Sequence, residues 1–148
     1  MNQLKNFYRK SSRYREKLKN CPNEYFDDYI QMVTHFLPAK KNFADLGCGT
    51  GQSSSLLSKY HQITGLDISP LFLKEAQKKF PQINFIKGDI TQLPFKSNSF
   101  DGAGCFNVLE HISVPQKAIV EMIRITKKGG LIFICCPNFL SPNISSMP

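Results

Sequence analysis

Short apolar runs alternate with amphipathic stretches over most of the chain after residue 42. The runs are rich in β-branched or small residues and are bounded by Gly, Pro, Asn or Asp, which is typical of buried strands. We expect strands at 43–45, 62–67, 83–89, 99–107 and 131–136. Strands that are apolar on both faces indicate a parallel sheet covered by helices.

Apolar residues spaced three and four positions apart predict helices at 52–60, 70–80 and 115–126, and we expect a turn at Gly129–Gly130. Another helix is expected at 23–37. Its apolar face would consist of Tyr25, Phe26, Tyr29, Ile30, Val33 and Phe36. The alternation of strands and helices predicts an α/β fold with a doubly wound parallel sheet.

The glycine-rich stretch after the first strand carries the most specific signal. Asp45 ends the strand, and Gly47, Gly49 and Gly51 follow at alternate positions. Glycine allows positive φ and lets a ligand approach the backbone, and the start of the next helix would present free N–H groups. Asp67 ends the second strand at an offset that is typical of a carboxylate binding a ribose diol.

The spacing of the glycines distinguishes between ribose-containing ligands. The dinucleotide pattern Gly-x-Gly-x-x-Gly makes room for a pyrophosphate. Here Gln52 stands at the third glycine position, and Gly51 comes one residue early. We therefore expect a nucleoside ligand that has no diphosphate.

The loop resembles the Asp-x-Gly-x-Gly-x-Gly motif of class I S-adenosylmethionine-dependent methyltransferases. Four more segments, in the same order, resemble the type 11 subgroup of that family. They are Asp89 with Leu93-Pro94-Phe95, Ser99-Phe100-Asp101, Val108-Leu109-Glu110-His111 and Arg124-Ile125-Thr126-Lys127-Lys128-Gly129-Gly130. The last segment has Lys128 where proline is commoner. The resemblance covers about Phe43 to Asn138 and implies a Rossmann-like sheet of strand order 3-2-1-4-5 with S-adenosyl-L-methionine as cofactor.

The resemblance also implies roles for the loop and the second strand. Gly47, Gly49 and Gly51 would line the methionine moiety of the cofactor, and Asp67 would bind the ribose hydroxyls. Asp45 belongs to the expected cofactor site as well. Asp45 could instead hydrogen-bond within the loop and helix, and Asp67 could instead cap the following helix.

Four further residues are expected around the rest of the cofactor. Ile68 would pack on the adenine ring, and Asp89, with Ile90 beside it, would reach the adenine amino group. A simple turn is the alternative for Asp89. Asn107 would lie near the amino end of the methionine moiety.

The sequence does not identify the catalytic residue. Glu110 and His111 are the candidates, because they follow the fourth strand, where the acceptor would lie. Histidine titrates near neutrality and could act as a base. The alternative is a structural pair that closes the loop. Some quinol O-methyltransferases link a carboxylate–His cluster here to a metal, but the upstream acidic residue of that pattern is Asn107 here, so we expect no metal.

These features predict a methyltransferase that transfers the sulfonium methyl group of S-adenosylmethionine to a small-molecule acceptor. Three alternatives stay open. They are an RNA or protein methyltransferase guided by a basic N-terminal segment, a cofactor-binding module without turnover, and a nicotinamide-dependent oxidoreductase.

Charge and cysteine content add little to this prediction. The net charge of +8 is concentrated in residues 1–20, which hold seven Lys or Arg and one Glu. Such a segment suits RNA, anionic lipid or an acidic substrate, but a solvated helix or frayed arm is the favoured interpretation. Five cysteines without a Cys-x-x-Cys pattern indicate a reducing compartment, the cytoplasm. No apolar stretch is long enough to span a bilayer.

We expect three parts, namely an N-terminal helical segment (1–41), the cofactor-binding core (42–138) and an irregular tail (139–148). Class I methyltransferases usually add two strands after the fifth, whereas this tail is rich in Ser, Pro and Asn. The strand at 131–136 would then be an exposed apolar edge, which natural proteins avoid. We therefore expect the sequence to be a fragment of a longer enzyme.

Overall fold

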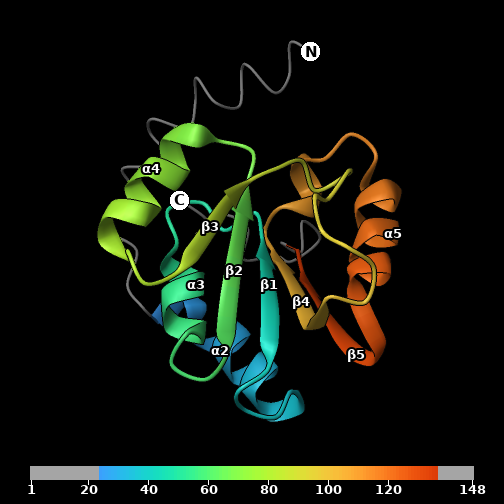
Figure 1. Cartoon of the computed structure of the whole chain (residues 1–148), viewed down its shortest axis with the longest axis horizontal. Helices are drawn as coiled ribbons and strands as arrows, with labels where there is room; N and C mark the ends of the chain where they lie inside the picture. Colours follow the sequence, from blue (N-terminus) through green and yellow to red (C-terminus); the bar gives the residue numbers. More distant parts are fainter. Residues whose placement is uncertain (1–23, 137–148) are drawn as a thin grey trace, which may run out of the picture. The chain divides into compact units, whose positions relative to one another are not determined.

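The computed structural model describes residues 24–136 (Figure 1). The chain divides into two units, and the sheet lies in the unit Asp28–Pro137. The other unit consists of Met1–Asp27 and Asn138–Pro148, of which only the first residues of one helix are described. The expectations for the basic segment and for the tail therefore lie outside the described residues, and the domain boundaries stay a prediction.

Helices and strands alternate along the described chain, as the apolar pattern predicts. The elements are α2 (Glu24–Phe36), β1 (Asn42–Leu46), α3 (Gln52–Leu57), β2 (Gln62–Asp67), α4 (Pro70–Lys79), β3 (Asn84–Lys87), β4 (Phe100–Phe106), the 3-10 helix η1 (Leu109–His111), α5 (Pro115–Ile125) and β5 (Thr126–Cys135). Each expected strand and helix between β1 and β5 is present, and only its ends differ.

The five strands form one parallel sheet in the order β3-β2-β1-β4-β5 (Figure 1). This confirms the predicted fold class and strand order. The order reverses at β1, because the chain goes outward through β2 to β3 and then returns to place β4 on the other side of β1. In open α/β sheets, ligands bind at the carboxyl ends of the strands at such a point.

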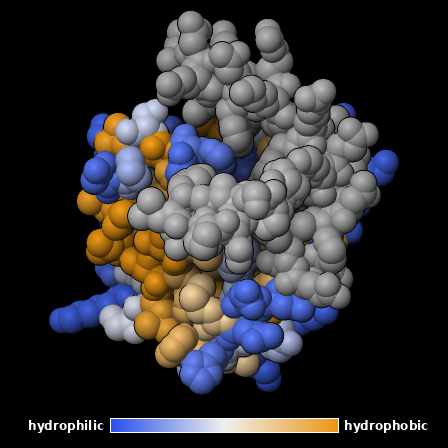
Figure 2. Space-filling view, turned by 180° about the vertical axis from the view of Figure 1, so that it is seen from behind, coloured by the Kyte–Doolittle hydropathy of each residue, from blue (hydrophilic) through white to orange (hydrophobic). Residues whose placement is uncertain are grey.

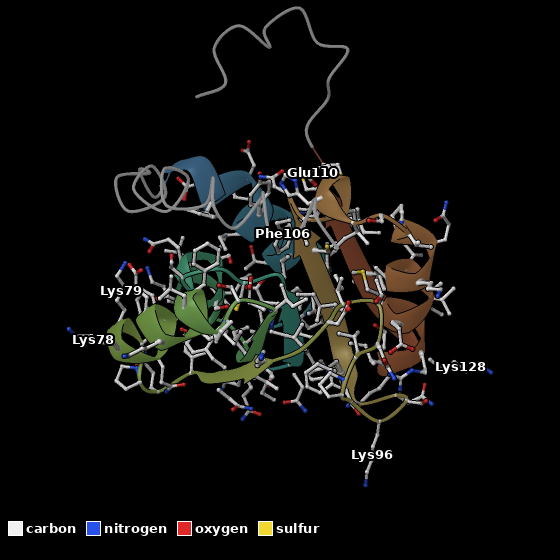
Figure 3. The ribbon with its side chains drawn as sticks, turned by 90° about the horizontal axis from the view of Figure 1, so that it is seen from above. Lys78, Lys79, Lys96, Phe106, Glu110 and Lys128 are labelled. Atoms are coloured by element: carbon white, nitrogen blue, oxygen red, sulfur yellow. The ribbon has the colours of Figure 1, made fainter. Side chains whose placement is uncertain are left out.

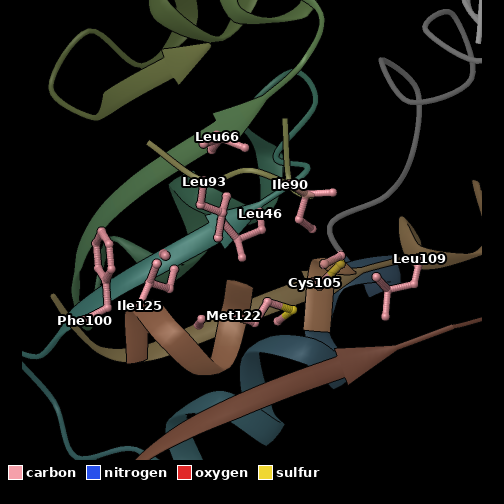
Figure 4. Packing of buried hydrophobic residues seen from close by; sticks show 12 residues of the cluster. Leu46, Leu66, Ile90, Leu93, Phe100, Cys105, Leu109, Met122 and Ile125 are labelled. Atoms are coloured by element: carbon pink, nitrogen blue, oxygen red, sulfur yellow. The ribbon is translucent and has the colours of Figure 1, made fainter. Parts of the chain in front are cut away.

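Alternating side chains of β1 distribute between two apolar clusters, one on each face of the sheet. Leu46 packs with Met122 of α5 in the first cluster (Figure 4). Phe43 packs with Val33 of α2 and Leu57 of α3 in the second. Burying a side chain of this size contributes about 1.5–3 kcal/mol. Helices on both faces therefore stabilise the sheet and fix the position of its carboxyl edge, the edge at which the parallel strands end.

The apolar face predicted for α2 is wrong at one residue. Phe36 is 62% exposed, whereas Leu37, just after the helix, is 4% exposed. The N–H of Leu37 donates to the carbonyl of Val33 at 2.8 Å, which continues the helical turn by one residue. Leu37 consequently joins Phe43 in the second cluster, and Phe36 faces outward.

The last strand begins earlier than the sequence predicts. Thr126 pairs with Phe100 of β4 directly after α5, and the chain then leaves the ladder until Leu131 pairs with Gly102. Gly129 adopts a φ of +79° within this excursion. The expected turn at Gly129–Gly130 is therefore an irregularity inside β5, in the manner of a β-bulge.

β5 lies at one end of the sheet and carries part of an apolar surface. Ile134 is 41% exposed, and Val120 and Ile123 of α5 are 62% and 60% exposed. Figure 2, seen from behind, shows apolar surface at the left, the side on which α5 and β5 lie after the view of Figure 1 is turned by 180°. Within residues 24–136, no helix is long and apolar enough to cross a membrane.

Candidate functional site

The loop between β1 and α3 turns at three glycines with positive φ. The φ angles of Gly47, Gly49 and Gly51 are 81°, 53° and 82°, a region that residues with a Cβ rarely adopt. The N–H groups of Gly47 and Cys48 donate to the carbonyl of Leu66 in β2, at 2.7 and 3.0 Å. The loop is thereby held at the carboxyl ends of β1 and β2.

The three glycines have different surroundings, and the expected contact of all three with a cofactor stays a prediction. A Cβ on Gly47 would lie 2.3 Å from the side chain of Val108, and one on Gly51 would lie 2.8 Å from Phe85. A Cβ on Gly49 would meet no atom within 4 Å. Gly47 and Gly51 therefore permit close packing within the protein, whereas Gly49 borders open space that a ligand can approach.

Asp67, the last residue of β2, connects the glycine loop to the start of α4. Its Oδ2 accepts a hydrogen bond from the N–H of Gly49 at 2.9 Å, and its Oδ1 accepts one from the N–H of Ser69 at 2.8 Å. Burial raises the pKa of Asp67, and these backbone hydrogen bonds oppose that effect. The helix cap itself is Ser69, whose hydroxyl accepts from the N–H of Phe72 at 3.4 Å.

Asp45 lies beneath the loop and is only 1% exposed. Its Oδ2 accepts hydrogen bonds from the hydroxyls of Ser53 and Ser54, at 2.8 and 2.5 Å, in the first turn of α3. Burial raises the pKa of the Asp45 carboxyl, and the two serines partly offset this. These bonds are the loop-to-helix contact that the sequence offered as the alternative, and a direct contact of Asp45 with a ligand stays a prediction.

Ser53 and Ser54 were not among the residues that the sequence pointed to. Their signal is two adjacent hydroxyl residues in the first turn of the helix that follows the glycines. A buried carboxylate needs donors, so serines at this position could have been matched to Asp45.

Three expected adenine-side residues lie on the loops that follow β2 and β3. Ile68 is 37% exposed, which leaves its side chain available to a ligand. Asp89 is exposed, and its Oδ1 accepts from the N–H and the hydroxyl of Thr91, at 2.8 and 2.7 Å. Ile90 is 6% exposed and packs in the first apolar cluster, which fixes the loop in place.

Asn107 follows β4 with a φ of +55°, which is uncommon for a residue other than glycine. Its Nδ2 donates to the hydroxyl of Tyr29 in α2 at 2.7 Å. The ring of Tyr29 stacks on Phe106, with 5.0 Å between the ring centroids. The sequence assigned Tyr29 only to an apolar helix face, because helical spacing gives no sign of a distant polar partner.

Glu110 and His111 lie in η1, beyond the carboxyl end of β4. Nε2 of His111 is 3.8 Å from Oε1 of Glu110, and the side chain of Glu110 is only 10% exposed. Oε2 of Glu110 is buried and has no hydrogen-bond partner among the described residues. Figure 3 shows Glu110 at the same end of the molecule as Phe106, while the four labelled lysines project elsewhere.

A buried carboxylate oxygen without a partner is costly, because its hydration is lost and nothing replaces it. Oε2 of Glu110 therefore has acceptor capacity that no described residue uses. The described part of the chain contains no group of three or more His, Cys, Asp or Glu side chains arranged to hold a metal ion.

Comparison with known proteins decides the family. A family model described as a methyltransferase domain, of type 11, matches residues 44–134, which is more than half of the 148-residue chain. The chain belongs to this methyltransferase family. The match includes the glycine loop, Asp67, Asp89 and the Glu110–His111 pair, so it covers the carboxyl edge of the sheet described above.

This methyltransferase domain spans less than two thirds of the curated relatives it matches here. A demethylmenaquinone methyltransferase of Renibacterium salmoninarum is 40% identical over 91 residues, which are 61% of this chain and 38% of the relative. An uncharacterised protein of Methanocaldococcus jannaschii is 34% identical over 145 residues, which are 93% of this chain and 62% of the relative.

Solved structures share the fold of the domain. A structure from Thermotoga maritima, described as an S-adenosylmethionine-dependent methyltransferase and possible histamine N-methyltransferase, has a TM-score of 0.69 at 29% identity and covers 86% of this chain and 58% of that one. The [4+2]-cyclase SpnF has a TM-score of 0.64 at 30% identity and covers 71% of this chain and 42% of that one. The second name shows that this fold is not restricted to methyl transfer.

The different surroundings of the glycines predict different costs of substitution. We expect Gly47→Ala to destabilise the domain by about 1–3 kcal/mol, because it combines backbone strain with a clash against Val108. Gly49→Ala should cost less, because only the strain applies. The measurement is the urea midpoint of each variant. A second change, Val108→Ala, should relieve part of the Gly47→Ala loss, and equal losses at both glycines or a purely additive double variant would contradict this account.

Proposed function

We propose that this domain binds S-adenosyl-L-methionine and transfers its methyl group to a small-molecule acceptor. The observation that carries the proposal is the arrangement at Gly49. This residue borders open space at the point where the strand order reverses, and its N–H is bound to the buried carboxylate of Asp67. A ribose without a diphosphate fits there, because Gln52 replaces the third glycine of the dinucleotide pattern.

Asp67 is the proposed partner of the ribose hydroxyls. Its two oxygens accept backbone hydrogen bonds from Gly49 and Ser69, and the lone pairs of a carboxylate leave room for a further bond. A ribose diol can therefore bind while the loop keeps its contacts. In this arrangement Gly47 and Gly51 shape the loop, Gly49 lies along the methionine moiety, and Asp45 holds α3 below it.

The adenine and methionine ends are assigned to the neighbouring loops. We place Ile68 against the adenine ring because its apolar side chain is partly exposed. Asp89 would accept from the adenine amino group through Oδ2, since Oδ1 is bound to Thr91. Ile90 fixes that loop, and Asn107 would face the amino end of the methionine moiety.

The proposed acceptor chemistry centres on Glu110. The cofactor supplies an already activated methyl group, so the residues of the chain chiefly orient the reactants and exclude water. A base is needed where the acceptor atom carries a proton, and Glu110 with His111 beside it provides one. Two relatives are named as methyltransferases of menaquinone or ubiquinone formation, which supports a small-molecule acceptor.

A cofactor-binding protein without methyl transfer is the second candidate, because a structural neighbour of 30% identity is named a cyclase. From the cysteine pattern of the sequence, we also propose a reducing compartment, the cytoplasm. An RNA or protein acceptor held by the basic segment remains the alternative from the sequence.

Removing the carboxylate of Asp67 should weaken the cofactor site. We expect Asp67→Ala to reduce the affinity for S-adenosylhomocysteine by about 1.5–3 kcal/mol, the range for a hydrogen bond to a charged group. The matched control is Asp101→Ala, because Asp101 also accepts a backbone N–H, from Asn42 at 2.9 Å, at the opposite end of the sheet. Calorimetry on folded proteins makes the comparison. Unchanged affinity in Asp67→Ala would remove Asp67 from the site.

Glu110→Gln should separate methyl transfer from cofactor binding. We expect the rate of labelled-methyl transfer from S-adenosylmethionine to reduced demethylmenaquinone to fall by roughly 10²–10⁴-fold, because general-base catalysis is lost. Affinity for S-adenosylhomocysteine should stay unchanged, since Glu110 lies outside the proposed cofactor site. Transfer at the wild-type rate would refute a role as base. A wild-type protein that binds the cofactor and methylates no acceptor would favour the second candidate.

A further inference from the structure

Two side chains of α5 hold the segment Asp89–Phe95, which is part of the connection between β3 and β4. Nη1 of Arg124 donates to the carbonyl of Phe95 at 2.7 Å, and Nη2 donates to the carbonyl of Leu93 at 3.0 Å. Oε2 of Glu121 accepts from the N–H of Leu93 at 2.6 Å. The same helix therefore binds both polar backbone groups of Leu93.

Glu121 and Arg124 also bind each other, so they act as one unit. Nε of Arg124 donates to Oε1 of Glu121, and Nη2 donates to Oε2, both at 2.7 Å. A planar guanidinium can make this bidentate contact and still reach two carbonyls, which a lysine ammonium cannot. We call this pair the Glu121–Arg124 clamp.

Apolar packing and one backbone bond connect the clamp to Asp89. Leu93 and Ile90 are 5% and 6% exposed and lie in the same cluster as Leu46 (Figure 4). In the same segment, the N–H of Gln92 donates to the carbonyl of Asp89 at 3.0 Å. A shift of Leu93 would therefore move Ile90 and Asp89 with it.

The other end of the segment is attached to β2. The N–H of Gly88, which precedes Asp89, donates to the carbonyl of Asp67 at 3.0 Å. Asp89 therefore directly follows Gly88, which is bonded to the proposed ribose-binding residue Asp67. In the other direction, it lies a few residues before Leu93, which the clamp holds. Two attachments of this kind define the position of its carboxylate relative to Asp67.

We propose that the Glu121–Arg124 clamp positions Asp89 and Ile90 for the base of the nucleoside, so that α5 sets selectivity for adenine without touching the cofactor. This inference rests on the proposed function. Glu121 and Arg124 are positioning residues. A clamp that only stabilised the fold would affect all nucleoside ligands alike, whereas a positioning clamp determines how strongly the site distinguishes one base from another.

The test compares two ligands that differ at the adenine amino group. S-inosylhomocysteine carries a carbonyl where S-adenosylhomocysteine carries the amino group, so it cannot donate from that position to Asp89, and its N1–H lies at a different point of the ring. We expect the wild-type full chain to bind the adenosyl ligand at least roughly tenfold more tightly, as loss of one charged hydrogen bond implies. Arg124→Met should reduce this ratio to about threefold or less, chiefly by weakening the adenosyl ligand.

Three further variants sharpen the result. Arg124→Lys keeps the charge but not the forked geometry, so its ratio should be intermediate. Glu121→Gln keeps the shape of the side chain and should also lower the ratio, which gives an answer if Arg124→Met does not fold. Lys117→Met removes one positive charge from the exposed face of the same helix and should leave the ratio unchanged. Calorimetry gives the affinities, and thermal unfolding confirms that each protein is folded.

The outcomes separate this inference from the proposed function. A wild-type chain that binds neither ligand contradicts the proposed function itself. A wild-type chain that binds both equally shows that Asp89 does not receive the amino group, and the inference falls. If the wild type discriminates but the clamp variants keep the ratio, or lose both affinities by the same factor, the clamp is structural only.

Discussion

The hydrogen bonds that the carboxylate of Asp67 accepts hold together the carboxyl edge of the sheet, the edge at which the parallel strands end. This carboxylate is buried at the end of β2, and a buried charge must find donors within the protein. Its donors include the N–H groups of Gly49 and Ser69, so one side chain is bonded both to the glycine loop and to the residue that caps α4. The same carboxylate keeps acceptor capacity for a ligand, which links the fold of the edge to its proposed function.

A second buried carboxylate supports the loop from below. Asp45 is bound by two serine hydroxyls of α3, so the helix cannot shift without breaking a buried hydrogen bond. Burial and the charges of Asp45 and Asp67 raise the pKa of the Cys48 thiol well above its ordinary value. Cys48 therefore stays a neutral thiol and serves as a small apolar residue within the loop.

Local pattern predicted the elements because apolar periodicity and glycine positions are properties of neighbouring residues. It did not separate the three glycines, since the contact of Gly47 with Val108 and of Gly51 with Phe85 arises only when distant elements pack. For the same reason the Glu-x-x-Arg spacing in α5 indicates only a surface ion pair. Its bonds to the backbone of Leu93 depend on how a loop from the other half of the sheet lies against the helix.

We propose that Gly49 and Asp67 form a site for a nucleoside that has no diphosphate. The most direct measurement is an NMR titration of the isotopically labelled chain with S-adenosylhomocysteine and, separately, with NAD. The amide signals of Gly49 and Ser69 report on it, because both groups donate to Asp67. We expect both signals to shift and saturate with S-adenosylhomocysteine and not to respond to NAD. Signals that ignore S-adenosylhomocysteine, or that respond equally to NAD, would contradict the proposal.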